Sequence, residues 1–65
     1  MKTASYETVR RLMFEKDIRK ADVIRGAKIS RPTLMKWERG EMPSLPTIKK
    51  VADYFGVSIT EFLGE

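Results

Sequence analysis

The segment Lys20–Arg39, KADVIRGAKISRPTLMKWER, decides the fold of this chain. Apolar residues recur in it at the three- and four-residue spacing of an amphipathic α-helix, first in residues 20–27 and again in residues 30–39. Only three to four residues separate these two stretches. A turn that short usually sets two helices at a steep angle, and the start of the second helix then points outward from the protein. The segment therefore predicts two short helices joined by a tight turn.

The ends of the second of these helices are well marked. Ser30 is a good N-cap residue, and Pro32 fits the first turn of a helix because no intrahelical N–H is lost there. Gly40, just beyond Arg39, suits a left-handed C-terminal cap. The first helix is less well marked, because Arg19 stands where Ser or Asp would normally cap it.

Three further helices are expected outside this segment. One runs from Ser5 to about Lys16, and one is opened by Ser44 and stopped by Gly56. A last short helix begins at the capping box Ser58-Ile59-Thr60-Glu61. The apolar residues expected to face inward in these helices are Val9, Leu12, Met13, Leu45, Ile48, Val51, Ala52, Phe55, Ile59, Phe62 and Leu63. With no stretch of strand-like alternation, the prediction is a single all-α domain, a compact five-helix bundle over residues 1–65.

The charge of the chain is unevenly distributed. Residues 1–40 hold eleven Lys and Arg against five Asp and Glu, a net charge of +6, whereas residues 41–65 hold two against four, a net charge of −2. Seven of the basic residues lie between Arg19 and Arg39. A local basic patch beside an acidic remainder favours a polyanionic partner such as nucleic acid, although charge alone also fits a solvated helix face.

The composition argues against several function classes. The chain has no histidine and no cysteine, so it lacks the commonest general base, the usual zinc ligands and every disulfide. We therefore expect no catalytic residues, no metal site and no cofactor. No apolar run approaches the roughly 20 residues of a membrane span. These features predict a cytoplasmic protein that does not enter a membrane.

Several motifs then carry a family resemblance. They are Val23-Ile24, Ile29-Ser30, Leu34, Trp37-Glu38-Arg39-Gly40, Pro43-Ser44-Leu45, Val51-Ala52, Phe55-Gly56-Val57-Ser58-Ile59 and Glu61-Phe62-Leu63. Together they resemble the phage repressor and Cro-type (xenobiotic-response-element-like) helix-turn-helix family over residues 9–63. The resemblance implies a lambda-repressor-like DNA-binding domain with its helix-turn-helix at residues 20–39.

The chain departs from the family pattern at four positions. Ile24 replaces the usual Ala of the second helix, and Lys20 replaces the Gln that commonly opens it. Lys28 replaces the usual Gly of the turn, so this residue must either adopt a left-handed backbone or belong to a different type of turn. Met13 replaces the Arg that pairs with the Glu before Arg-Gly, which leaves Glu38 without its usual partner.

The resemblance also implies which residues contact DNA. At 100° per residue, Leu34 and Trp37 share the inward side of the third helix and Lys36 and Arg39 the opposite side. The positions that contact bases in the family correspond to Arg31, Pro32, Thr33 and Lys36. The expected phosphate contacts are Lys20, Ser30 and Arg39.

The main functional prediction is a sequence-specific transcription regulator, a repressor, that binds double-stranded DNA. A single helix-turn-helix makes few base contacts, so we expect a homodimer on a pseudo-palindromic operator. The candidate dimer surface consists of Val57, Ile59, Phe62 and Leu63, with a place in the core as the alternative for Phe62. A protein-interaction module of the same fold, an antitoxin or an adaptor, remains the alternative function.

Overall fold

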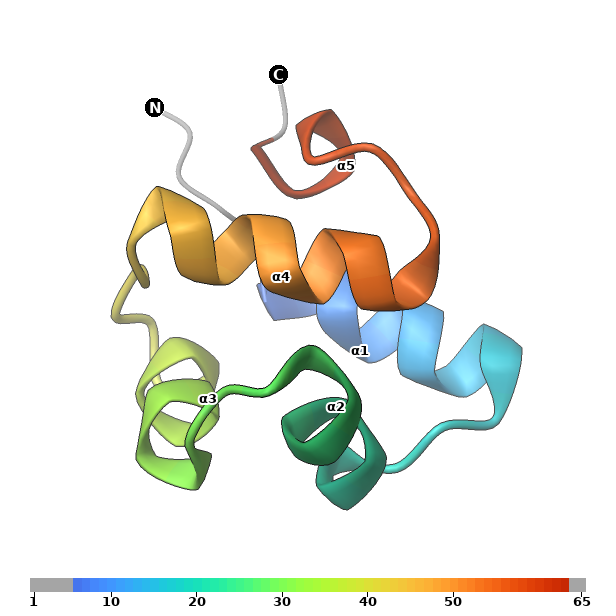
Figure 1. Cartoon of the computed structure of the whole chain (residues 1–65), viewed down its shortest axis with the longest axis horizontal. Coiled ribbons are helices and arrows are strands. Elements are labelled where there is room, and N and C mark those ends of the chain that lie inside the picture. Colours follow the sequence, from blue (N-terminus) through green and yellow to red (C-terminus); the bar gives the residue numbers. More distant parts are fainter. Residues whose placement is uncertain (1–5, 64–65) are drawn as a thin grey trace.

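The computed structural model describes residues 6–63, which form five α-helices and no strand. The helices are α1 (Tyr6–Lys16), α2 (Lys20–Ala27), α3 (Arg31–Glu38), α4 (Leu45–Phe55) and α5 (Thr60–Leu63). Figure 1 shows α4 running across the molecule in front of α1, with α5 on one side of it and α2 and α3 on the other. The predicted all-α architecture is confirmed, and the bounds of α2 and α3 agree with the predicted helix-turn-helix.

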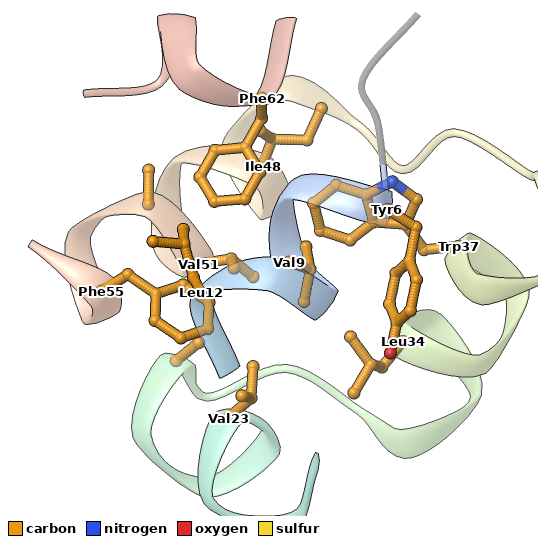
Figure 2. Close-up of a cluster of buried hydrophobic side chains, with 12 residues drawn as sticks. Tyr6, Val9, Leu12, Val23, Leu34, Trp37, Ile48, Val51, Phe55 and Phe62 are labelled. Atoms are coloured by element: carbon orange, nitrogen blue, oxygen red, sulfur yellow. The ribbon is translucent and has the colours of Figure 1, made fainter. Parts of the chain in front are cut away.

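The core lies between α4 and the surrounding helices. Its two largest fully buried side chains are Trp37 from α3 and Phe62 from α5, whose rings lie 5.8 Å apart. Figure 2 shows Val9, Val51 and Ile48 from α1 and α4 completing the cluster. Because α3 contributes Leu34 and Trp37, each 1% exposed, its rotation about its own axis is fixed by the core.

The helix ends agree in large part with the predicted signals. The Ser30 hydroxyl accepts the backbone N–H of Thr33 at 3.3 Å, which confirms Ser30 as the N-cap of α3. Lys28 adopts the left-handed backbone, with φ of 60° and ψ of 46°, at a cost of about 1 kcal/mol or more for a residue with a Cβ. The turn between α2 and α3 thus keeps the geometry for which glycine is usual.

One inward-facing residue and one helix start differ from the predictions. Leu45 was expected to face the core but is 56% exposed, because it is the first residue of α4 and helical side chains lean toward the N-terminus. The last helix begins at Thr60, so the predicted capping box at Ser58 does not form. The Ser58 hydroxyl instead accepts the N–H of Thr60 at 3.3 Å. Ser5, the expected first residue of the first helix, lies outside the described residues.

Candidate nucleic-acid interface

The outward face of α3 carries most of the side chains predicted to contact DNA bases. Arg31, Pro32 and Lys36 are exposed and Thr33 is half-buried. On the opposite side of the helix, Trp37 lies in the core, 6.0 Å from the ring of Tyr6. Exposed donors on one side and buried anchors on the other give α3 a rigid, basic outer face.

The first turn of α3 is partly occupied by its own cap. The hydroxyls of Ser30 and Thr33 lie 2.7 Å apart and share a hydrogen bond. Pro32 has no N–H, and the N–H of Thr33 is donated to Ser30. Of the first three residues of α3, only Arg31 therefore offers a backbone N–H to an external acceptor, so an anion at this helix end would have to be held mainly by side chains.

A groove beside the outer face of α3 was not predicted from the sequence. It lies between α3 and the start of α4 and is lined by Thr33, Lys36, Glu41, Met42, Pro43, Ser44 and Thr47. The hydroxyls of Ser44 and Thr47 lie 3.0 Å apart at the first turn of α4. Ser44 is a helix-start signal in the sequence, and the fold places it next to Thr33 and Lys36, two of the predicted base-contacting residues.

The partner of Glu38 is Lys20. The Nζ atom of Lys20 lies 2.8 Å from Oε1 of Glu38, so the first residue of α2 is joined to the last residue of α3. The hydrogen bond raises the pKa of Lys20 and lowers the pKa of Glu38, and both groups remain charged at neutral pH. A predicted phosphate contact is thus also the ion-pair partner that the sequence did not reveal.

A second acidic residue, Asp22 in the first turn of α2, bonds to the start of that helix. The side chain of Arg19 makes no cap hydrogen bond, in agreement with the sequence analysis. The backbone N–H of Arg19 instead donates to the Asp22 carboxylate at 3.2 Å, and the same carboxylate lies 3.0 Å from Arg25. Asp22 therefore stabilises the beginning of the helix that carries Lys20.

Tyr6 packs behind the ion pair. Its hydroxyl is buried and makes no hydrogen bond among the described residues, and Figure 2 shows the ring reaching toward Leu34. Burial raises the pKa of Tyr6, and the negative charge of Glu38 raises it further. On the solvent side, the Arg10 guanidinium lies 5.1 Å from the centre of the ring.

The apolar surface that could serve a dimer is smaller than the one predicted from the sequence. Phe62 is 0% exposed within the single chain, so its inclusion in that surface was wrong and its alternative assignment to the core is confirmed. The ring fits there because α5 packs on α1 and α4 and places Phe62 between Trp37 and Phe55. Val57, Ile59 and Leu63 are half-buried and pack against the edge of the core.

Two further features concern residues 6–63 only. No group of three acidic side chains in this range is arranged to hold a metal ion. None of the helices here is both long enough and apolar enough to cross a membrane.

Residues 8–64 match the sequence profile of the Cro/C1-type HTH DNA-binding domain. The chain is 31% identical over 58 residues to a protein of Vibrio cholerae named the cryptic phage CTXphi transcriptional repressor RstR. The match covers 88% of this chain and 52% of that protein, so the chain spans about half the length of this relative. No solved structure gives a significant match.

Proposed function

Because this chain belongs to the family of Cro/C1-type helix-turn-helix DNA-binding domains, we propose that it represses transcription by inserting α3 into the major groove of an operator. The observation that carries the proposal is the fixed orientation of α3. Leu34 and Trp37 are buried, and the exposed Arg31 and Lys36 lie on its outer face. The name of the phage repressor relative supports repression as the outcome.

Each base-contacting residue has a role that follows from its chemistry. Arg31 can donate in a bidentate manner to O6 and N7 of guanine, and Lys36 can donate to the same atoms. Pro32 presents an apolar ring without an N–H, which suits the methyl group of thymine. When the Ser30 hydroxyl donates to it, the Thr33 hydroxyl keeps its own O–H to donate to a phosphate or to an acceptor on a base edge.

Phosphate contacts surround this face. Lys20 at the start of α2 and Arg39 after α3 are exposed cations, and Ser30 caps α3 between them. The groove at the start of α4 adds the hydroxyls of Ser44 and Thr47 beside Lys36. These groups fix the position of the protein on the duplex, while α3 supplies the base preference.

The proposal includes a homodimer on a pseudo-palindromic site. One α3 covers only a few base pairs, which is too little to select a site from a genome. Two chains related by a two-fold axis double the base contacts and match the symmetry of an inverted repeat. Val57, Ile59 and Leu63 offer a small apolar surface for this association, so we expect dimerisation to be coupled to DNA binding.

The test is selection of bound duplexes from a random pool, followed by sedimentation of the protein with a selected duplex. The proposal predicts an inverted repeat with half-sites about 34 Å apart and two chains per duplex. One chain on a site without a repeat would overturn the dimer. Failure to enrich any sequence would overturn sequence-specific binding and favour the protein-interaction alternative.

A further inference from the structure

The ion pair between Lys20 and Glu38 places both charges at the unfavourable ends of their helices. Lys20 is the first residue of α2, where the helix dipole favours negative charge. Glu38 is the last residue of α3, where the dipole favours positive charge. The helix dipoles therefore disfavour both charges, and the bond between them joins the two helices of the helix-turn-helix.

The pair is also too exposed to be a strong structural link. The Lys20 side chain is 46% exposed and that of Glu38 is 29% exposed, and ion pairs at the surface add little to folding stability. The two partners are nevertheless unequal, because the Glu38 side chain is the more buried one and the Lys20 side chain is more exposed to solvent. An ammonium has three N–H donors, so the bond to Glu38 leaves two for another acceptor.

We propose that Glu38 is a positioning residue for DNA binding, which holds the Nζ atom of Lys20 at the start of α2 where it donates to a DNA phosphate. This inference rests on the proposed function, because it assumes that Lys20 contacts the DNA backbone. A free lysine side chain loses rotamer freedom when it binds, and a lysine already held by Glu38 loses less. Glu38 thus favours binding although its own charge repels phosphate.

Two effects of opposite sign make the inference testable. If Glu38 acted only through its charge, its removal would tighten DNA binding by the same factor with or without Lys20. If Glu38 positions Lys20, its removal weakens binding, and only while Lys20 is present. A double-mutant cycle separates these cases because it measures the dependence of one substitution on the other.

The experiment measures dissociation constants for a fluorescent duplex of random sequence at low salt, by anisotropy, for wild type, Lys20→Ala, Glu38→Ala and the double variant. Circular dichroism at the same temperature establishes that each protein is folded. A parallel cycle with Glu38→Gln keeps an acceptor for Lys20 and covers the case in which Glu38→Ala fails to fold. Glu41→Gln is the control for the loss of a negative charge alone, since it removes one such charge beside Lys36 and leaves the pair of Lys20 and Glu38 in place.

We expect Glu38→Ala to weaken binding by roughly threefold or more in the presence of Lys20, with little or no weakening in the Lys20→Ala background. Glu38→Gln should fall between wild type and Glu38→Ala, and Glu41→Gln should tighten binding slightly. Equal effects of Glu38→Ala in both backgrounds, or tighter binding in the presence of Lys20, would overturn the positioning role alone. If wild type fails to bind any duplex, the proposed function fails as well.

Discussion

The ring of Tyr54 in α4 lies directly on Gly26 in α2, so closely that a Cβ at position 26 would overlap the ring. α4 packs against α2, so this contact forms part of the packing that holds the helix-turn-helix on the bundle. Gly26 is helical, and its role here is a close approach between two helices.

Gly26→Ala should therefore destabilise the protein although alanine is the better helix former. Displacement of the Tyr54 ring is expected to cost about 1–3 kcal/mol of unfolding free energy. The control is the same substitution in a Tyr54→Ala background, where it should stabilise by about 0.5 kcal/mol or more. Urea unfolding checks both, and stabilisation by Gly26→Ala in the wild-type background would contradict the contact.

Lys36→Ala and Lys20→Ala should have different effects on DNA binding. Lys36 lies on the outer face of α3, so its loss should relax the base preference at one position of the selected site. Lys20 is assigned to a phosphate, so its loss should weaken binding to all sequences by a similar factor. Affinities for a set of single-base variants of the selected site distinguish the two. The reverse pattern would mean that α3 lies in the groove with another orientation.

The titration of Glu38 should report its bond to Lys20. A lowered folded-state pKa means that the carboxylate contributes stability above its unfolded-state pKa and loses that contribution as the pH falls through the folded-state pKa. The raised pKa of Lys20 means that its contribution is present below its unfolded-state pKa and is lost as the pH rises through the folded-state value. The pair is therefore intact across the neutral range.

An NMR titration of the Glu38 carboxyl carbon should show a depressed midpoint that returns to the ordinary range in Lys20→Ala. A midpoint unchanged by Lys20→Ala would contradict the bond.

Tyr6→Phe should leave the fold intact and stabilise it by up to about 1 kcal/mol. The hydroxyl of Tyr6 is buried without a partner among residues 6–63, and a buried polar group without a hydrogen bond is unfavourable. The phenylalanine ring retains the contact with Trp37 at 6.0 Å. Thermal unfolding measures the change, and a clear loss of stability would show that the hydroxyl does have a partner in solution.

Helix starts, stops and inward faces could be predicted from the sequence because their causes are local. Ser30 caps α3 through a residue three positions away, and Trp37 is buried because it shares a helix side with Leu34. The left-handed backbone at Lys28 was one of two predicted options, since the short turn restricts the conformations available there.

The remaining features depend on which helices meet, which one sequence does not show. Leu45 is a separate case, since it has the spacing of an inward residue and is exposed because it is the first residue of α4. Lys20 and Glu38 are eighteen positions apart, and their contact exists only once α2 and α3 are packed. The same holds for Tyr54 and Gly26, and for Ser44 beside Lys36.

The salt dependence of duplex binding tests the central claim, that the basic face around α3 binds DNA, most directly. Dissociation constants of wild type for a labelled duplex should be measured between about 50 and 200 mM salt. Log affinity should fall linearly with log salt concentration, and Arg39→Ala should reduce the slope by about one. Lys49→Ala, which removes the same charge from an ion pair with Asp53 on α4, should leave the slope unchanged. Binding that does not depend on salt, or no binding to any duplex, would contradict the account.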